Sequence, residues 1–107
     1  MKLLKQLCKI HSPSGEEGLI KKFILQYINN NKKHWKTIPQ IIEGENIQDN
    51  IILVFGKPRT AIFSHMDTIG FTVKYNNEII KIGGPQVIEG TELVGKDKKG
   101  DIFGKIV

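Results

Sequence analysis

The sequence predicts a mixed α/β fold, because two amphipathic helical segments are followed by short apolar runs. These runs are separated by residues that favour turns. The chain has 107 residues, which is enough for one small domain with a modest core. Beyond Gly70 the pattern changes to short alternating runs punctuated by glycine, a composition typical of β-barrels. We therefore predict a domain boundary near this residue, with 1–70 and 71–107 as separate units.

Residues 1–11 carry apolar side chains at helical spacing, which predicts the first helix. The helix is expected to end at Ser12, because a residue that precedes proline avoids the helical conformation. The chain's one cysteine, Cys8, lies in this helix and is predicted to be a small buried apolar residue rather than a nucleophile. A single cysteine excludes an internal disulfide and fits a reducing cytoplasm.

A second helix is predicted to begin at Ser14, because Ser14 and Glu17 have the spacing of a capping box. Three successive asparagines, 29–31, favour turns and are expected to end it. The apolar stripe between these signals is expected to face the core. It comprises Leu19, Ile20, Phe23, Ile24, Tyr27 and Ile28.

Extended segments are predicted at 35–42, 50–55 and 60–64. Pro39 makes the first an edge strand or an irregular segment. The second is almost wholly apolar, so we expect both of its faces to be buried. The third contains the run Ala-Ile-Phe at 61–63 and is predicted to be a buried strand.

Two hairpins are predicted in the second half of the chain. Residues 71–75 alternate between apolar and polar, 76–78 are turn formers, and 79–82 return as an apolar run. Lys98, Lys99 and Gly100 are predicted to form a second hairpin tip. The last residues resemble an unfinished strand, so we expect this chain to be the N-terminal piece of a longer polypeptide.

His65 and Asp67 directly follow the predicted strand at 60–64. Residues two apart in a strand point to the same side, so both side chains can face one point past its C-terminal end. Open α/β sheets bind their ligands at that end. A histidine beside a carboxylate suits a metal site, although such a pair is by itself more often a structural hydrogen-bonded pair. His11 and His34 are not spaced to join it.

Residues 65–71 have the sequence HMDTIGF and closely resemble the His-Met-Asp-x-Ile-Gly-Phe segment of the M42 family of metallo-aminopeptidases, the glutamyl aminopeptidase type. Residues 12–17 are similar to the family's Ser-Gly-x-Glu turn, and the pair at 49–50 to its Gly-Asn or Asp-Asn pair. Residues 81–84 and 93–95 look like the start of its inserted domain. The resemblance covers nearly the whole chain, and Ser64 and Thr68 replace the more usual alanine and glutamate.

The resemblance implies a fold and a function. Residues 1–70 would be the N-terminal part of a three-layer αβα zinc-peptidase domain, and 71–107 the start of a β-rich inserted oligomerisation domain. His65 would be a ligand of one ion in a site for two divalent metal ions, zinc, cobalt or manganese, and Asp67 a catalytic residue that supports this ligand. The remaining ligands and the general-base glutamate would come from sequence outside this chain. The implied activity is removal of N-terminal residues from peptide substrates by a homo-oligomeric enzyme, and we expect this chain alone to be inactive.

Two alternatives remain open at this point. The chain could belong to a binding or scaffold protein that retains the peptidase fold without hydrolysis, or to a related M20 or M28 hydrolase of another amide. The net charge of +5 could suggest nucleic acid, but the lysines are spread along the chain and aromatic residues are few, so we expect no nucleic-acid partner. No apolar run approaches a membrane span of about 20 residues, and lysines interrupt any signal-peptide core. We therefore expect a cytoplasmic protein with no membrane partner.

Overall fold

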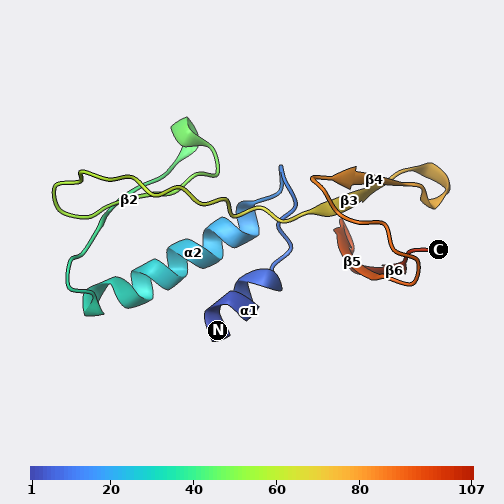
Figure 1. The fold of residues 1–107 in the computed structure, drawn as a ribbon, viewed down its shortest axis with the longest axis horizontal. Coiled ribbons are helices and arrows are strands. Elements are labelled where there is room, and N and C mark those ends of the chain that lie inside the picture. Colours follow the sequence, from blue (N-terminus) through green and yellow to red (C-terminus); the bar gives the residue numbers. More distant parts are fainter.

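The computed structural model describes residues 1–107 and has a mixed α/β fold (Figure 1). Two helices, α1 and α2, come first, and three separate two-stranded antiparallel sheets follow. The helices and the first sheet lie in one half of an elongated molecule, and the other two sheets lie in the opposite half. The elements are α1 (Lys2–Cys8), α2 (Gly18–Asn31), β1 (Gln40–Ile42), β2 (Ile52–Val54), β3 (Gly70–Val73), β4 (Ile79–Ile82), β5 (Glu92–Asp97) and β6 (Gly100–Lys105), with 3₁₀ turns η1 (Lys32–His34), η2 (Glu45–Ile47) and η3 (Tyr75–Asn77).

Both predicted helices are present, but the prediction of a capping box at the start of α2 is wrong. The helix begins at Gly18, and Glu17 occupies the N-cap position without a side-chain hydrogen bond to the helix. The carboxylate of Glu17 instead accepts a hydrogen bond of 2.8 Å from the backbone N–H of Gly15. The hydroxyl of Ser14 donates to Asp67, and Ser14 lies four residues before the first helical residue, Gly18.

The buried core is small. Of the stripe predicted on α2, only Ile20 and Ile28 are fully buried, whereas Leu19 and Tyr27 are exposed. The radius of gyration is 17.0 Å, compared with about 13 Å for a compact domain of this length. The accessible surface is 9316 Å², against roughly 6,000 Å² for a compact monomer of this mass. The apolar stripe of α2 is therefore only partly covered by the rest of the chain.

The extended segments of the first half are shorter and less buried than the sequence predicts. Strand β1 begins only after Pro39, and its register pairs Ile41 with Leu53 of β2. Ile52 and Phe55 are exposed, so the expectation that both faces of 50–55 are buried is wrong. A sheet of two strands with no covering layer cannot bury both of its faces.

The buried strand predicted at 60–64 is not formed. The segment has no regular secondary structure, and Ile62 and Phe63 are 93% and 92% exposed. A strand exists only through pairing with a neighbour, and no other segment of this chain lies in register beside it. The apolar run therefore has the composition of a strand but lacks the partner that would make it one.

Both predicted hairpins of the second half are confirmed. Strands β3 and β4 pair from Gly70 with Ile82 to Val73 with Ile79. Two asparagines of the connecting turn adopt positive φ, a conformation that asparagine tolerates better than most residues. Strands β5 and β6 turn at residues 98–99, as expected.

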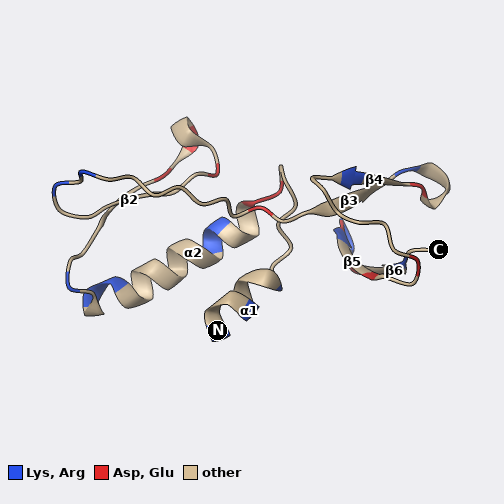
Figure 2. Ribbon diagram, viewed as in Figure 1, with Lys and Arg blue, Asp and Glu red and all other residues tan.

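Cys8 is exposed, so the prediction that it is buried is wrong; α1 is short and has no fully buried residue. Lysine and arginine residues lie in both halves of the molecule and are interspersed with acidic residues (Figure 2). None of the helices is both long enough and apolar enough to cross a membrane.

Candidate functional site

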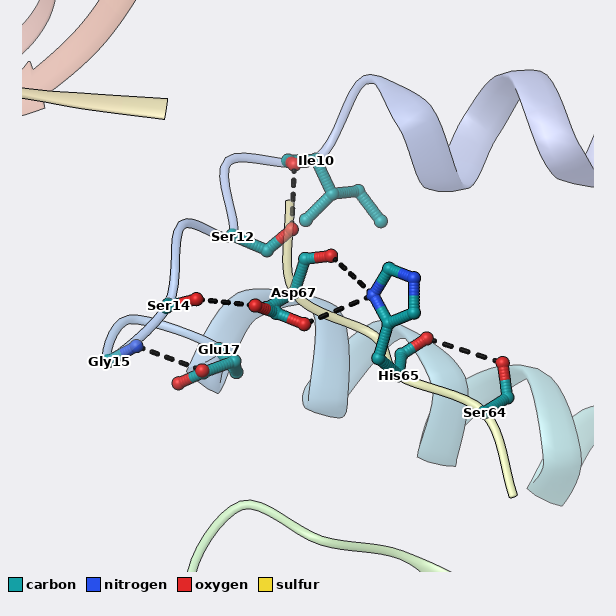
Figure 3. A network of polar contacts seen from close by, with 8 residues as sticks. All are labelled: Ile10, Ser12, Ser14, Gly15, Glu17, Ser64, His65 and Asp67. Atoms are coloured by element: carbon teal, nitrogen blue, oxygen red, sulfur yellow. Dashed lines mark hydrogen bonds and ion pairs between the residues drawn. The ribbon is translucent and has the colours of Figure 1, made fainter. Parts of the chain in front are cut away.

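The segment that carries His65 and Asp67 is held by the linker between α1 and α2, not by a sheet (Figure 3). The backbone N–H of Thr68 donates a hydrogen bond of 2.8 Å to the carbonyl oxygen of Ser12. An isolated parallel bridge joins Pro13 to Thr68. Ser12 is fully buried at this contact. The position of the site relative to the linker is therefore set by backbone contacts.

The side chains of His65 and Asp67 meet, although the strand from which this was predicted is not formed. The Nδ1 atom of His65 lies 3.0 Å from the carbonyl oxygen of Asp67 and 3.1 Å from its Oδ1 atom. Both of these oxygens are acceptors, so in the neutral ring Nδ1 carries the proton. The lone pair is then on Nε2, which has no hydrogen-bond partner, and the side chain is 85% exposed. The ring presents a free nitrogen to solvent.

The second carboxylate oxygen of Asp67, Oδ2, accepts a hydrogen bond from the hydroxyl of Ser14. This bond is the main cause that lowers the pKa of Asp67 below its ordinary value. The hydrogen bond and charge of His65 lower the pKa further, whereas partial loss of contact with water raises it. Asp67 is therefore ionised at neutral pH and can accept the Nδ1–H of the ring.

A hollow of about 600 Å³ that is open to solvent lies beside this pair. The loop 45–50 forms its other wall, and the ammonium group of Lys21 helps to hold this loop by donating to the carbonyl oxygen of Gln48 at 2.9 Å. Lys21 also pairs with Glu43 at 3.3 Å. The lining is almost wholly polar and consists of Gly15, Glu17, Gln48, Asp49, Asn50, Ser64, His65, Met66 and Asp67.

Sequence reasoning missed part of this site. The spacing of Ser14 and Glu17 matches a helix cap, and this local motif predicts a different role for both residues. Asp49 drew notice only through its place in the family resemblance. In the structure, Ser14 and Glu17, two polar residues of one linker, lie beside a motif more than 45 residues later in the chain. No rule based on local spacing detects such a contact.

The predicted strand-end position of the pair is wrong, because 60–64 is not a strand. The other histidines do not join the site: His11 contacts Glu16 at 3.0 Å, and His34 is exposed in η1. Nowhere does the chain bring together three or more histidine, cysteine, aspartate or glutamate side chains that could hold a metal ion.

His65 and Asp67 fit the arrangement of one metal ligand and the carboxylate that supports it. Histidines that bind metals commonly donate their other ring N–H to a carboxylate or a backbone carbonyl, and His65 does both. A scan against protein-family models gives no match for this chain. Membership of the M42 family therefore stays a prediction from the motif.

Proposed function

We propose that this chain is the N-terminal part of a metal-dependent aminopeptidase of the M42 type. One observation carries the proposal: within the HMDTIGF motif, Asp67 holds the Nδ1–H of His65 and leaves Nε2 free and exposed. A histidine prepared in this way is a typical ligand for zinc or cobalt. His65 would bind one of two divalent ions, and residues outside this chain would supply the other ligands.

The chain's own residues then have distinct tasks. His65 would donate the Nε2 lone pair to an ion. Asp67 keeps the ring in the required tautomer and makes it a stronger ligand, because the carboxylate stabilises positive charge on the imidazole. When bound, divalent ions would supply Lewis-acid chemistry for a water molecule and for the carbonyl of the scissile peptide bond. The general base is expected to be a glutamate outside this chain.

The large uncovered surface supports the proposal that the chain is part of a larger fold. Ile62 and Phe63 are almost fully exposed, and the molecule has about 3,000 Å² more surface than a compact monomer would have. Such apolar surface is costly in water. We propose that further polypeptide covers it in a three-layer αβα domain formed with residues 1–70, and that 71–107 begin the inserted domain of a cytoplasmic homo-oligomer.

Zinc binding by the chain itself tests the proposed ligand. Zn²⁺ is titrated into the ¹⁵N-histidine-labelled chain, and the ring nitrogens of His65 and His34 are followed by NMR. His34 is a matched control, because it is exposed and has no hydrogen-bond partner in the structure. A hydrogen bond from the other ring nitrogen of a histidine ligand to a carboxylate or carbonyl is worth roughly 10-fold or more in metal affinity. We expect His65 to bind through Nε2 about 10-fold more tightly than His34, and equal affinity would contradict the proposed role.

Activity tests the rest of the proposal. The purified chain, supplied with zinc, cobalt or manganese, should not hydrolyse a panel of aminoacyl anilides, because His65 and Asp67 are too few to hold two ions. A longer polypeptide that contains this sequence should hydrolyse them. In that polypeptide, His65→Ala should abolish turnover and His34→Ala should not. Full turnover and metal content in His65→Ala would show that His65 is only a structural residue.

A further inference from the structure

Ser14 makes a contact with the site that the roles of His65 and Asp67 do not explain. Its hydroxyl comes from the linker between the helices and donates to Oδ2 of Asp67, a residue 53 positions later in the sequence. The Nδ1 atom of His65 contacts the other oxygen, Oδ1, as well as the backbone carbonyl oxygen of Asp67. Figure 3 shows the three side chains in a row, with the carboxylate between the hydroxyl and the ring.

The linker holds the Ser14 hydroxyl in place. The carbonyl oxygen of Pro13 accepts a hydrogen bond of 2.8 Å from the N–H of Glu16, which closes a turn around Ser14. Gly15 takes a φ of +91°, a conformation that L side chains rarely adopt. The backbone hydrogen bond from the N–H of Thr68 to the carbonyl oxygen of Ser12 fixes the linker against the site.

We propose that Ser14 is a positioning residue, whose hydroxyl holds the Asp67 carboxylate in the orientation that selects the Nδ1–H tautomer of His65. The torsion that rotates a carboxylate is broad and weakly restrained, so one contact to an exposed ring does not fix it. The Ser14 hydroxyl adds a second contact on the opposite oxygen. The geometric part of this inference stands on the structure alone, and its consequence for metal binding rests on the proposed function.

A purely structural role for the hydroxyl is the competing explanation. The linker and the site are already joined by the Thr68 to Ser12 hydrogen bond and by the Pro13–Thr68 bridge. Both of these are backbone contacts that do not need a side chain at residue 14. The hydroxyl therefore adds orientation of Asp67 to an attachment that exists without it.

Ring-nitrogen NMR of the full 107-residue chain tests the inference. At pH about 8, above the ordinary pKa of histidine, the ¹⁵N shifts distinguish a protonated ring nitrogen from a bare one. We expect the Nδ1–H form of His65 to dominate in the wild type. The backbone carbonyl of Asp67 still accepts from Nδ1–H in Ser14→Ala, and only the Oδ1 contact is weakened. We therefore expect a fall of roughly two- to fivefold in the ratio of Nδ1–H to Nε2–H forms.

Three further variants make the test specific. Ser14→Thr keeps the hydroxyl and should retain the wild-type ratio, whereas Ser14→Val has the shape of threonine without it and should behave as Ser14→Ala. Thr60→Ala removes an exposed hydroxyl with no hydrogen bond in the structure and should change nothing. An unchanged ratio in Ser14→Ala or Ser14→Val overturns the inference, as does a wild-type ring in the Nε2–H form. Unfolding of Ser14→Ala also overturns it, because the hydroxyl would then serve folding.

The two proposals can fail separately. If the tautomer responds to the Ser14 variants but His65 binds Zn²⁺ no better than His34, the positioning role stands and the proposed function fails. If His65 binds Zn²⁺ preferentially and Ser14→Ala changes neither the tautomer nor the affinity, the proposed function stands and the role of Ser14 is refuted.

Discussion

Replacing Ile28 with alanine should destabilise the chain strongly, whereas the same replacement at Ile62 should have almost no effect. Ile28 is 4% exposed on α2, and Ile62 is 93% exposed in the segment that the sequence predicts to be a buried strand. The two substitutions remove the same three carbon atoms. The difference between them therefore measures burial, and it separates the observed structure from the predicted strand.

The expected magnitude follows from the atoms removed. Each buried CH₂ or CH₃ group contributes about 0.8 kcal/mol, so Ile28→Ala loses roughly 2.4 kcal/mol before any cavity is counted. The higher helix propensity of alanine returns about 0.5 kcal/mol, and the cavity adds to the loss. We expect a net loss of about 2–3 kcal/mol, which lowers the Tm by roughly 10–20 °C. Ile62→Ala should stay within about 0.5 kcal/mol of the wild type.

Urea unfolding followed by tryptophan fluorescence measures both variants. Trp35 is the chain's one tryptophan, and its ring centroid lies 6.2 Å from that of Phe55, so separation of these rings reports unfolding of the first half. Equal m-values are needed before the midpoints are compared. A loss at Ile62 as large as the loss at Ile28 would refute the reasoning, because it would show that 60–64 is packed in solution.

The carboxyl pKa of Asp67, measured by ¹³C NMR, should lie below its ordinary value, and Ser14→Ala should raise it, because the Ser14 hydrogen bond is the largest cause of the shift. Since the folded-state pKa is the lower one, the stability contributed by Asp67 is complete above the unfolded-state pKa and is lost as the pH falls through the folded-state pKa. A urea-unfolding midpoint of the wild type that does not decrease over this acid range would contradict the shift. Gly83→Ala should cost about 1 kcal/mol or more in urea unfolding, because φ is +77° and the new Cβ would lie 3.1 Å from a methyl carbon of Ile69, whereas Gly84→Ala has open space and should cost less. Cys8 is exposed, so a thiol-specific disulfide reagent should modify it as fast in the native chain as in urea; strong native protection would restore the buried position that the sequence predicts.

The sequence by itself determined the elements that depend on local interactions. Helical periodicity located α2, and the turn residues at 76–78 and 98–100 located two hairpins, because a helix and a tight turn are stabilised by residues close together in the chain. The side chains of His65 and Asp67 meet as expected, although the strand geometry from which this was predicted is not formed.

The tertiary structure alone decided everything that needs a distant partner. The run at 60–64 has strand composition, but a strand forms only where another strand supplies its hydrogen bonds, and here none does. Ser14 matched a helix cap locally, yet its hydroxyl binds Asp67, because backbone contacts bring the two segments together across 53 residues. Burial and long-range hydrogen bonding depend on which segments meet, and residue type and spacing along one segment do not contain that information.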